Sequence, residues 1–347
     1  MCPHDTGRLP RSVLAFLLLA IVAGCGSRTG LEIASGSHAP SDASAPPPPS
    51  IDAGRPSLVL FGGTDETGAL LGDTWRWDGV EWTQLRPSSA PPPRAQATLT
   101  PLGDALVLVG GNVAPSDAGA FPVSADTWLW HGQSWSQAFP PVSPDARYGS
   151  AASAFGGGVV RIGGWKLVPP INAASATWTW DGTSWSAAND LASSYAPSAA
   201  TLNGVLVTFG GETDDRPTNV TSVWTGSKWT PLRPAHSPPP RRGASMAVLG
   251  SNLVLFGGDV IGRETWESVS DTWIWDGTDW TQAKPSTSPP PRSNAAMATL
   301  SGVVVLFGGA DFEIPVYADT WEWDGAEWTE RKVTGPGARW GAVMAGE

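Results

Sequence analysis

Short apolar runs that end in a pair of glycines recur along the chain at a nearly constant spacing. Six such pairs occur, and successive pairs lie 47 to 53 residues apart. Each is followed by a loop of variable length and then by a version of Asp-Thr-Trp-x-Trp-Asp-Gly-x-x-Trp. A period near 50 residues indicates a repeat architecture with one structural unit per period. The pairs are Gly62-Gly63, Gly110-Gly111, Gly163-Gly164, Gly210-Gly211, Gly257-Gly258 and Gly308-Gly309.

Each period contains four short segments with strand character and none with helical character. In the last period, Arg292–Leu300 is small and apolar, and Val303–Phe307 is a run typical of a strand buried on both faces. Thr320–Trp323 alternates tryptophan with polar residues, and Asp324-Gly325 indicates a two-residue type I′ turn before Trp328 on the returning strand. The pattern predicts an all-β fold with four antiparallel strands per repeat.

The Gly-Gly pairs after apolar strands and the spaced tryptophans that follow them resemble the kelch repeat, from about Ser57 to the end of the chain. The resemblance implies a six-bladed kelch-like β-propeller. The tryptophans at repeat positions are expected to fill the wedges between blades, and only Trp165, Trp266 and Trp340 fall outside the pattern. Kelch propellers include many binding modules and few enzymes, so the resemblance favours a binding function.

The first blade needs a strand from the other end of the chain. Leu58–Phe61 precedes the first Gly-Gly pair, but no innermost strand comes before it. Ala338–Met344 has the character of an innermost strand and has no blade after it. We therefore expect this C-terminal strand to pair into blade 1 and close the ring, which removes exposed sheet edges.

The first 24 residues have the organisation of an export signal. Arg8 and Arg11 precede an apolar segment, Val13–Val22, that is too short to span a membrane. The sequence VAGC at 22–25 resembles a bacterial lipobox, which implies cleavage before Cys25 and a lipid on its thiol. The glycine after Cys25, where an aspartate would signal inner-membrane retention, implies the outer membrane. The alternative is an ordinary secreted protein with an isolated cysteine.

These patterns divide the chain into three predicted segments. A lipoprotein signal peptide covers 1–24, and a lipidated cysteine with a disordered tether rich in Ser, Ala and Pro covers 25–56. The propeller covers 57–347. The protein is therefore expected in the bacterial cell envelope, anchored to the membrane through the lipid on Cys25.

Charge and the scarcity of metal ligands narrow the choice of partners. A formal net charge of −11 argues against binding to nucleic acid. The predicted propeller has no cysteine and only two histidines, His131 and His236, so neither a metal site nor a cofactor is expected. The expected partner of the propeller is a protein or a glycan.

Two classes of long, variable loops should emerge on one face of the propeller, where binding usually occurs. An arginine begins the innermost strand in five blades, and these arginines would form an anion-recognising ring at the mouth of the central channel. The alternative is that each pairs with the aspartate that precedes the third strand. The candidate ligand-binding residues are Arg94, Arg147, Tyr148, Tyr195, Arg241, Arg292 and Arg339, and the alternative arginine partners are Asp73, Asp126, Asp271 and Asp319.

Blades 3 and 4 depart from this arginine–aspartate pattern. Blade 4 has Ser194 at the arginine position and Val220 at the aspartate position. Because the arginine and the aspartate are both missing from this blade, the pattern favours arginine–aspartate pairing over an anion-binding ring. Blade 3 keeps Arg147 but has Ala176 at the aspartate position. Arg147 is therefore expected to be the arginine that lacks an acidic partner.

The leading hypothesis is an envelope lipoprotein whose loop face binds a protein or a glycan without catalysis, and no catalytic residue is assigned. The alternative is a carbohydrate-active enzyme, sialic-acid mutarotase-like or a lyase, with Arg, Tyr and acidic residues at the channel mouth. The kelch resemblance keeps this alternative open because the family includes the bacterial sialic-acid mutarotase. Carboxylates that follow the Gly-Gly pairs, such as Glu212 and Asp259, are expected to be solvated.

Overall fold

The computed structural model describes residues 55–113, 122–166, 172–173, 177–188, 194–262, 265–312 and 315–347. Pro56–Glu347 forms one compact unit. The predictions for the signal peptide, for Cys25 and for nearly all of the tether lie outside the described residues. Within the described residues, no helix has the length and apolar character needed to cross a membrane.

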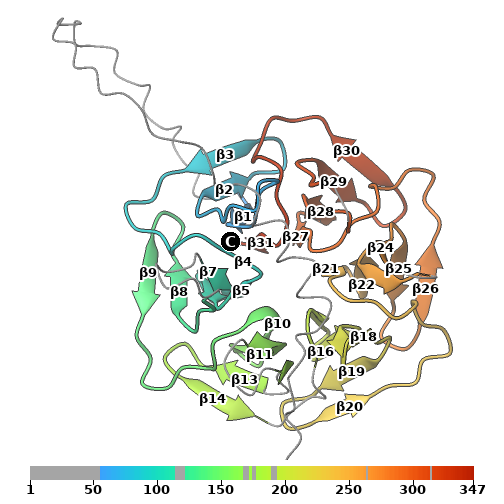
Figure 1. The fold of residues 1–347 in the computed structure, drawn as a ribbon, viewed down its shortest axis with the longest axis horizontal. Coiled ribbons are helices and arrows are strands. Elements are labelled where there is room, and N and C mark those ends of the chain that lie inside the picture. Colours follow the sequence, from blue (N-terminus) through green and yellow to red (C-terminus); the bar gives the residue numbers. More distant parts are fainter. Residues whose placement is uncertain are drawn as a thin grey trace, which may run out of the picture. The chain divides into compact units, whose positions relative to one another are not determined.

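Among the described residues, six antiparallel sheets with four main strands each surround a central axis, which confirms the predicted six-bladed β-propeller (Figure 1). In the described chain, blade 1 contains β31 (Val343–Gly346), β1 (Leu58–Phe61), β2 (Thr74–Trp77) and β3 (Trp82–Leu85), and blade 2 contains β5 (Thr98–Leu102), β6 (Ala105–Val109), β8 (Thr127–Trp130) and β9 (Trp135–Ala138). Blade 3 contains β10 (Tyr148–Phe155), β11 (Gly158–Lys166), β13 (Thr177–Trp180) and β14 (Trp185–Ala188), and blade 4 contains β15 (Ser198–Leu202), β16 (Val205–Phe209), β19 (Thr221–Trp224) and β20 (Trp229–Pro231). Blade 5 contains β21 (Ser245–Leu249), β22 (Asn252–Phe256), β25 (Thr272–Trp275) and β26 (Trp280–Ala283), and blade 6 contains β27 (Ala296–Leu300), β28 (Val303–Phe307), β29 (Thr320–Trp323) and β30 (Trp328–Arg331).

Blade 1 closes the ring by joining the two ends of the propeller (Figure 1). β31 pairs antiparallel with β1, so that Val343 lies opposite Phe61 and Gly346 opposite Leu58. The predicted closure by the C-terminal strand is confirmed, although the strand begins at Val343 and not at Ala338. All four residues of β1 are at most 1% exposed, because both of its edges are paired.

One residue from each blade closes a hydrogen-bonded ring around the channel. These residues have φ between +50° and +64°, and each N–H donates to the carbonyl of its equivalent in the preceding blade at 2.7–2.9 Å. Positive φ interrupts an extended backbone, so most innermost strands begin later than predicted; β21, for example, begins at Ser245 and not at Arg241. We call this set the axial ring, and its members are Gln96, Gly149, Ala196, Gly243, Asn294 and Gly341.

The fourth-strand tryptophans link each blade to the one before it. In every blade, the indole Nε1 donates to Oγ1 of the threonine that begins the preceding blade's third strand, at 2.9–3.0 Å. The indole also packs on the preceding sheet; the rings of Trp82 and Phe307 lie 5.1 Å apart. This confirms the predicted packing between blades and explains the threonine of the repeat. The pairs are Trp82–Thr320, Trp135–Thr74, Trp185–Thr127, Trp229–Thr177, Trp280–Thr221 and Trp328–Thr272.

The turns after the third strands differ from the predicted two-residue type I′ turns. Trp323 pairs directly with Trp328, so 324–327 form the loop. The Oδ1 atom of Asp324 accepts two backbone N–H groups within this loop, at 2.8 and 2.9 Å, and Gly325 takes a φ of +107°. The aspartate therefore stabilises the turn through its side chain, and it does not adopt the positive φ that a type I′ turn requires.

Short ribbons extend the loop face where the sequence predicted only loops. They hold residues that follow the Gly-Gly pairs beside residues that precede the axial ring, as the bridge between Tyr195 and Glu212 shows. The pairs are β17 (Glu212–Thr213) with β18 (Arg216–Pro217), β23 (Asp259–Ile261) with β24 (Trp266–Ser268), β4 (Arg94–Ala95) with β7 (Asn112–Val113), and β12 (Asn172–Ala173) with the end of β11.

The Gly-Gly pairs are required by a close approach of the next blade. The N–H of the second glycine donates to the carbonyl of the residue that begins that blade; Gly309 donates to Arg339 at 2.8 Å, and the same bond occurs in all six blades. A Cβ on the first glycine would lie 2.4–2.7 Å from this carbonyl. No other residue type fits there, because real Cβ atoms do not approach so closely and both glycines have positive φ.

We expect Gly308→Ala to destabilise the propeller by at least about 3 kcal/mol, because the new Cβ would lie 2.5 Å from the Arg339 carbonyl oxygen at a φ of +67°. Gly302→Ala is the matched control. It has a φ of +85° and no heavy atom within 4 Å of the new Cβ, so its cost should be limited to about 1–2 kcal/mol of backbone strain. Urea unfolding measures both, and equal losses would contradict the proposed contact between blades.

Candidate functional site

Four of the five predicted ring arginines are buried and paired with the aspartate that precedes the third strand of the same blade. Arg292 is 1% exposed and donates to both carboxylate oxygens of Asp319, at 2.6 and 2.8 Å. It also donates to the carbonyls of Gly308 and Pro290. The structure therefore agrees with the alternative hypothesis, in which the arginines pair with aspartates. These guanidinium groups do not form an open anion-binding ring. The equivalent pairs are Arg94–Asp126, Arg241–Asp271 and Arg339–Asp73.

The arginine of blade 3 is also paired, so the expectation that Arg147 lacks an acidic partner is wrong. Its Nη2 donates to Asp145 at 2.9 Å, and its Nη1 donates to the carbonyl of Gly163. A carboxylate from the preceding loop thus substitutes for the aspartate that this blade lacks. In blade 4, Ser194 replaces the arginine and donates to the carbonyl of Gly210.

Pairing also controls the charge of the four aspartates. Burial alone raises their pKa, but hydrogen bonds and charge from the arginine outweigh burial and hold each pKa below its ordinary value. The carboxylates therefore stay ionised at neutral pH. Each pair ties the start of an innermost strand to the third strand of the same blade, which is a structural role.

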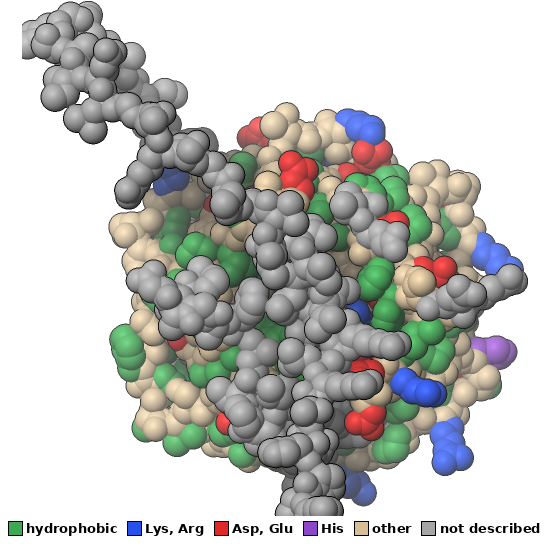
Figure 2. Space-filling model, viewed as in Figure 1, with side chains coloured by type: hydrophobic (Ala, Val, Ile, Leu, Met, Phe, Trp, Pro, Cys, Tyr) green, Lys and Arg blue, Asp and Glu red, His purple; other side chains and the backbone are tan. Residues whose placement is uncertain are grey.

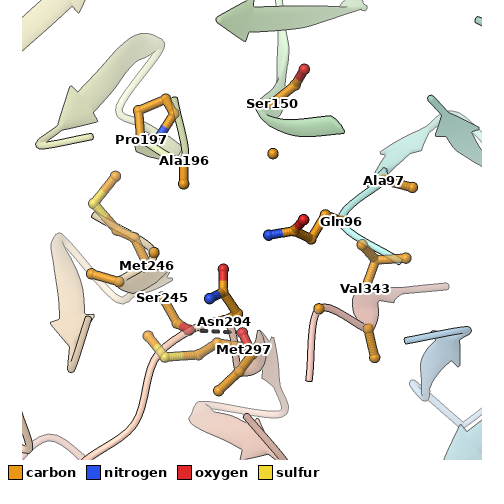
Figure 3. Close-up of a pocket in the computed structure, with 16 residues that line it drawn as sticks. Gln96, Ala97, Ser150, Ala196, Pro197, Ser245, Met246, Asn294, Met297 and Val343 are labelled. Carbon is orange, nitrogen blue, oxygen red and sulfur yellow. Dashed lines mark hydrogen bonds between the residues drawn. The ribbon is translucent and has the colours of Figure 1, made fainter. Parts of the chain in front are cut away.

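A cavity of about 160 Å³ lies on the axis, bounded by the axial ring and by the residues that follow it. The side chains of Gln96 and Asn294 point into this cavity, with Ser245, Met246 and Met297 around it (Figure 3). Its described lining contains no Arg, Lys, Asp or Glu. The mouth of the channel is therefore neutral, whereas the sequence predicted a cationic one.

Beside the axial ring, blades 4 and 5 bring two carboxylates onto a second arginine. Arg242 forms ion pairs with Glu212 and, at 3.9 Å, with Asp259, and all three residues are at most 4% exposed. The expectation that these carboxylates are solvated is wrong, because ribbons β17–β18 and β23–β24 place them against Arg242. Sequence reasoning missed Arg242. The available signal was the Arg241-Arg242 doublet, which no other blade has at this position.

Two aromatic side chains lie against Arg242, and two more pack on one of these rings. The guanidinium of Arg242 lies 4.0 Å from the ring centroid of Trp266 and 5.8 Å from that of Tyr195. Tyr195 packs edge-on against Tyr148 at 5.6 Å and against Trp165 at 6.2 Å. The two predicted tyrosines therefore lie together with two tryptophans, Trp165 at the end of β11 and Trp266 in β24. We call the set the mouth cluster, and its members are Tyr148, Trp165, Tyr195, Glu212, Arg242, Asp259 and Trp266.

The mouth cluster brings arginine, tyrosine and carboxylate together, but its members are engaged with one another. Burial raises the pKa of Asp259, with a smaller opposing effect from Arg242, and burial raises the pKa of Tyr148 and Tyr195. Both phenols are therefore neutral at neutral pH. The described cavity lining contains none of the seven, so the cluster supports the mouth from the side.

The other charged side chains of the described residues do not form a candidate metal site. No group of three or more His, Cys, Asp and Glu side chains that could hold a metal ion occurs among the described residues. On the face seen in Figure 2, acidic and hydrophobic side chains are interspersed, and Lys and Arg lie mostly toward the edge.

Comparison with known proteins gives a family match and similar solved structures. The KLHDC2/KLHL20/DRC7 Kelch-repeats domain matches residues 171–345. The solved structure reported as "Structure of YjhT" has a TM-score of 0.61 and 16% sequence identity, and the alignment covers 75% of this chain and 91% of that chain. At this identity the likeness shows a common fold.

We expect Asp319→Asn to destabilise the protein by about 3–5 kcal/mol at pH 7, because it leaves the buried Arg292 charge without its partner. The folded-state pKa of Asp319 is depressed, so the pair's contribution is present above the ordinary aspartate pKa and is lost as pH falls through the folded value. The difference from the parent should therefore shrink in acid, below about pH 4. Chemical denaturation at several pH values measures it.

Asp104→Asn is the matched control for this substitution. Asp104 is an exposed turn residue, and its replacement should change the unfolding free energy by less than about 0.5 kcal/mol. A loss at Asp319 no larger than this control would contradict a structural role for the arginine–aspartate pairs.

Proposed function

We propose that this chain, which belongs to the Kelch-repeat family, is a cell-envelope lipoprotein whose propeller binds a protein or a glycan at the channel mouth without catalysis. The Kelch-repeat propeller is a fold consistent with a binding scaffold, and Kelch propellers generally bind proteins.

The mouth cluster beside the neutral cavity is the observation that carries the binding proposal. Ligand sites combine aromatic side chains with a few placed polar groups around a concavity. Here Tyr148, Trp165 and Tyr195 adjoin one another next to the axial ring, which supplies the side chains of Gln96 and Asn294. The arginines of the innermost strands are paired with carboxylates, so they are not part of the proposed contact surface.

The envelope location and the lipid anchor rest on the N-terminal sequence. A basic start, a short apolar segment and the sequence VAGC at 22–25 together support export and lipid attachment at Cys25. A propeller anchored in this way would present its loops to partners within or outside the envelope.

A carbohydrate-active enzyme, sialic-acid mutarotase-like or a lyase, is the second candidate. Tyr195, Glu212 and Arg242 do converge beside the mouth, which is the arrangement that an enzyme would need. Their burial favours a supporting role. Proton NMR of the protein with free sialic acid and with sialylated oligosaccharides tests turnover, and an accelerated anomeric exchange or a cleaved product would replace the binding proposal.

We expect Cys25→Ser to abolish incorporation of labelled palmitate and to move the protein from the membrane fraction to the soluble fraction of bacterial cells, because the serine hydroxyl does not replace the thiol that would carry lipid. Gly26→Ala is the control and should keep the label. Equal labelling of the parent and the serine variant, or no labelling of either, would contradict the anchor.

We expect Trp165→Ala to weaken binding of the physiological partner at least tenfold, because an aromatic side chain at a contact surface typically contributes 1.4 kcal/mol or more, in rough terms. Partners are captured by cross-linking to the full-length protein in cells and identified by mass spectrometry, and their affinities are then measured. Phe139→Ala is the control, since Phe139 is 83% exposed and lies outside the mouth cluster. If only Phe139→Ala weakened binding, the contact surface would lie outside the mouth cluster.

A further inference from the structure

The axial ring alternates glycine with larger residues. Gly149, Gly243 and Gly341 supply blades 3, 5 and 1, whereas blades 2 and 6 have Gln96 at a φ of +54° and Asn294 at a φ of +53°. A left-handed conformation costs free energy at a residue other than glycine, and residues held in this way concentrate at functional sites. Since glycine serves in three blades, the backbone does not require the two amide residues, and their side chains need another explanation.

Glycines in the neighbouring blades make room for these amide side chains. A Cβ on Gly341 would lie 3.0 Å from Cγ of Gln96, and a Cβ on Gly243 would lie 3.1 Å from Oδ1 of Asn294. Each amide therefore extends across the glycine of the preceding blade and reaches over the channel (Figure 3).

The mouth cluster holds one of the two amides in place. Gln96 Nε2 donates to the Tyr195 hydroxyl at 3.0 Å, and the tyrosine ring passes over Gly149, where a Cβ would lie 2.3 Å from a ring carbon. Tyr195 is itself packed against Tyr148 and lies near Arg242. Side chains locked by their neighbours in this way are suited to ligand contacts, because little freedom remains to be lost on binding.

Each of the two amide side chains retains a carbonyl oxygen that can accept a hydrogen bond from a ligand. Gln96 uses its Nε2 on Tyr195, and Asn294 uses its Nδ2 on the Ser293 hydroxyl at 3.1 Å. Among the contacts of the described residues, neither side-chain carbonyl oxygen accepts a hydrogen bond. A ligand that satisfies both oxygens must bring hydrogen-bond donors.

The lining of the cavity behind the two amide side chains disfavours charged ligands. Its described lining consists of Ala, Gly, Ser, Pro, Met and Val residues besides Gln96 and Asn294. An anionic ligand would meet no cation in this lining, and a cationic ligand would meet no carboxylate, so either would lose its hydration without compensation. The small volume admits the end of a ligand and leaves the remainder at the loop face.

We propose that the channel mouth binds the uncharged terminal sugar of a glycan, with Gln96 and Asn294 accepting hydrogen bonds from its hydroxyl groups. This rests on the proposed binding function and names its ligand class. A neutral sugar carries several hydroxyl donors on one compact ring, which matches two acceptors at a neutral cavity. Tyr195 adds an aromatic edge beside them and fixes the orientation of Gln96.

Glycine substitutions test this proposal without disturbing the ring. Gln96→Gly and Asn294→Gly remove the amides and introduce the residue type that three blades already use, so the fold should persist. Asn203→Gly is the matched control, because Asn203 also holds an amide side chain at a φ of +50° but is an exposed turn residue outside the axial ring. The full-length protein is titrated with oligosaccharides ending in glucose, galactose, mannose or N-acetylglucosamine, with sialylated oligosaccharides and with a peptide library.

We expect each amide variant to lose at least tenfold in affinity for a neutral oligosaccharide, with unchanged binding by the control and a parent-like unfolding midpoint for all three. Neutral-sugar binding that survives in both variants would overturn this inference and leave the proposed function intact. If the parent bound only sialylated oligosaccharides or only peptides, this inference would also be overturned and the proposed function would stand. A parent that binds none of these probes would remove the inference, and the cross-linking experiment then decides the proposed function separately.

Alanine variants cover the case in which the glycine variants fail to fold. Gln96→Ala and Asn294→Ala introduce the residue type that blade 4 already has in the ring, at a φ of +50°, and remove each carbonyl acceptor. We expect the same tenfold or greater loss from each, and undiminished affinity in folded protein would overturn the proposal.

Discussion

Every blade of the propeller is stabilised by its two neighbours through bonds that close on themselves. Three kinds of bond recur six times: the axial ring joins backbone to backbone, the second glycine of each pair donates to the next blade, and a tryptophan donates to a threonine of the preceding blade. Because β31 completes blade 1, no blade lacks a neighbour. The geometry of the mouth is consequently a property of the whole ring, and no single blade determines it.

The architecture could be predicted because the residues that recur in the repeats of this chain are the ones that form these bonds between blades. Glycine pairs, spaced tryptophans and the unpaired first strand led directly to six blades and to closure by the last strand. The turns were harder to predict, since Asp-Gly is compatible with a two-residue turn. Asp324 instead accepts two backbone N–H groups in a longer loop, which is a local choice between two allowed geometries. The late start of the innermost strands follows from positive φ at residues such as Gln96, which no sequence pattern marked.

The candidate site was predictable only in part, and the reason is the difference between repeated and unique positions. Tyr148 and Tyr195 were identified because they follow the repeated position that holds an arginine in five of the six blades. That arginine position itself proved structural, since Arg292 and its equivalents are saturated by aspartate and carbonyl oxygens. Arg242, Gln96 and Asn294 occur at positions where the residue type varies among the blades. Their roles depend on which side chains lie across the channel, and pairs such as Gln96 and Tyr195 are far apart in the chain.

The axial ring also has an electrostatic consequence. Its six N–H groups each donate to the preceding blade, so the peptide dipoles follow one another around a circle. Dipoles arranged head to tail in a line, as in a helix, leave a partial charge at each end, whereas the same dipoles in a closed circle cancel. The ring therefore surrounds the channel with six polar groups but projects almost no field along the axis, and an ion approaching the mouth is neither attracted nor repelled by the backbone that frames it.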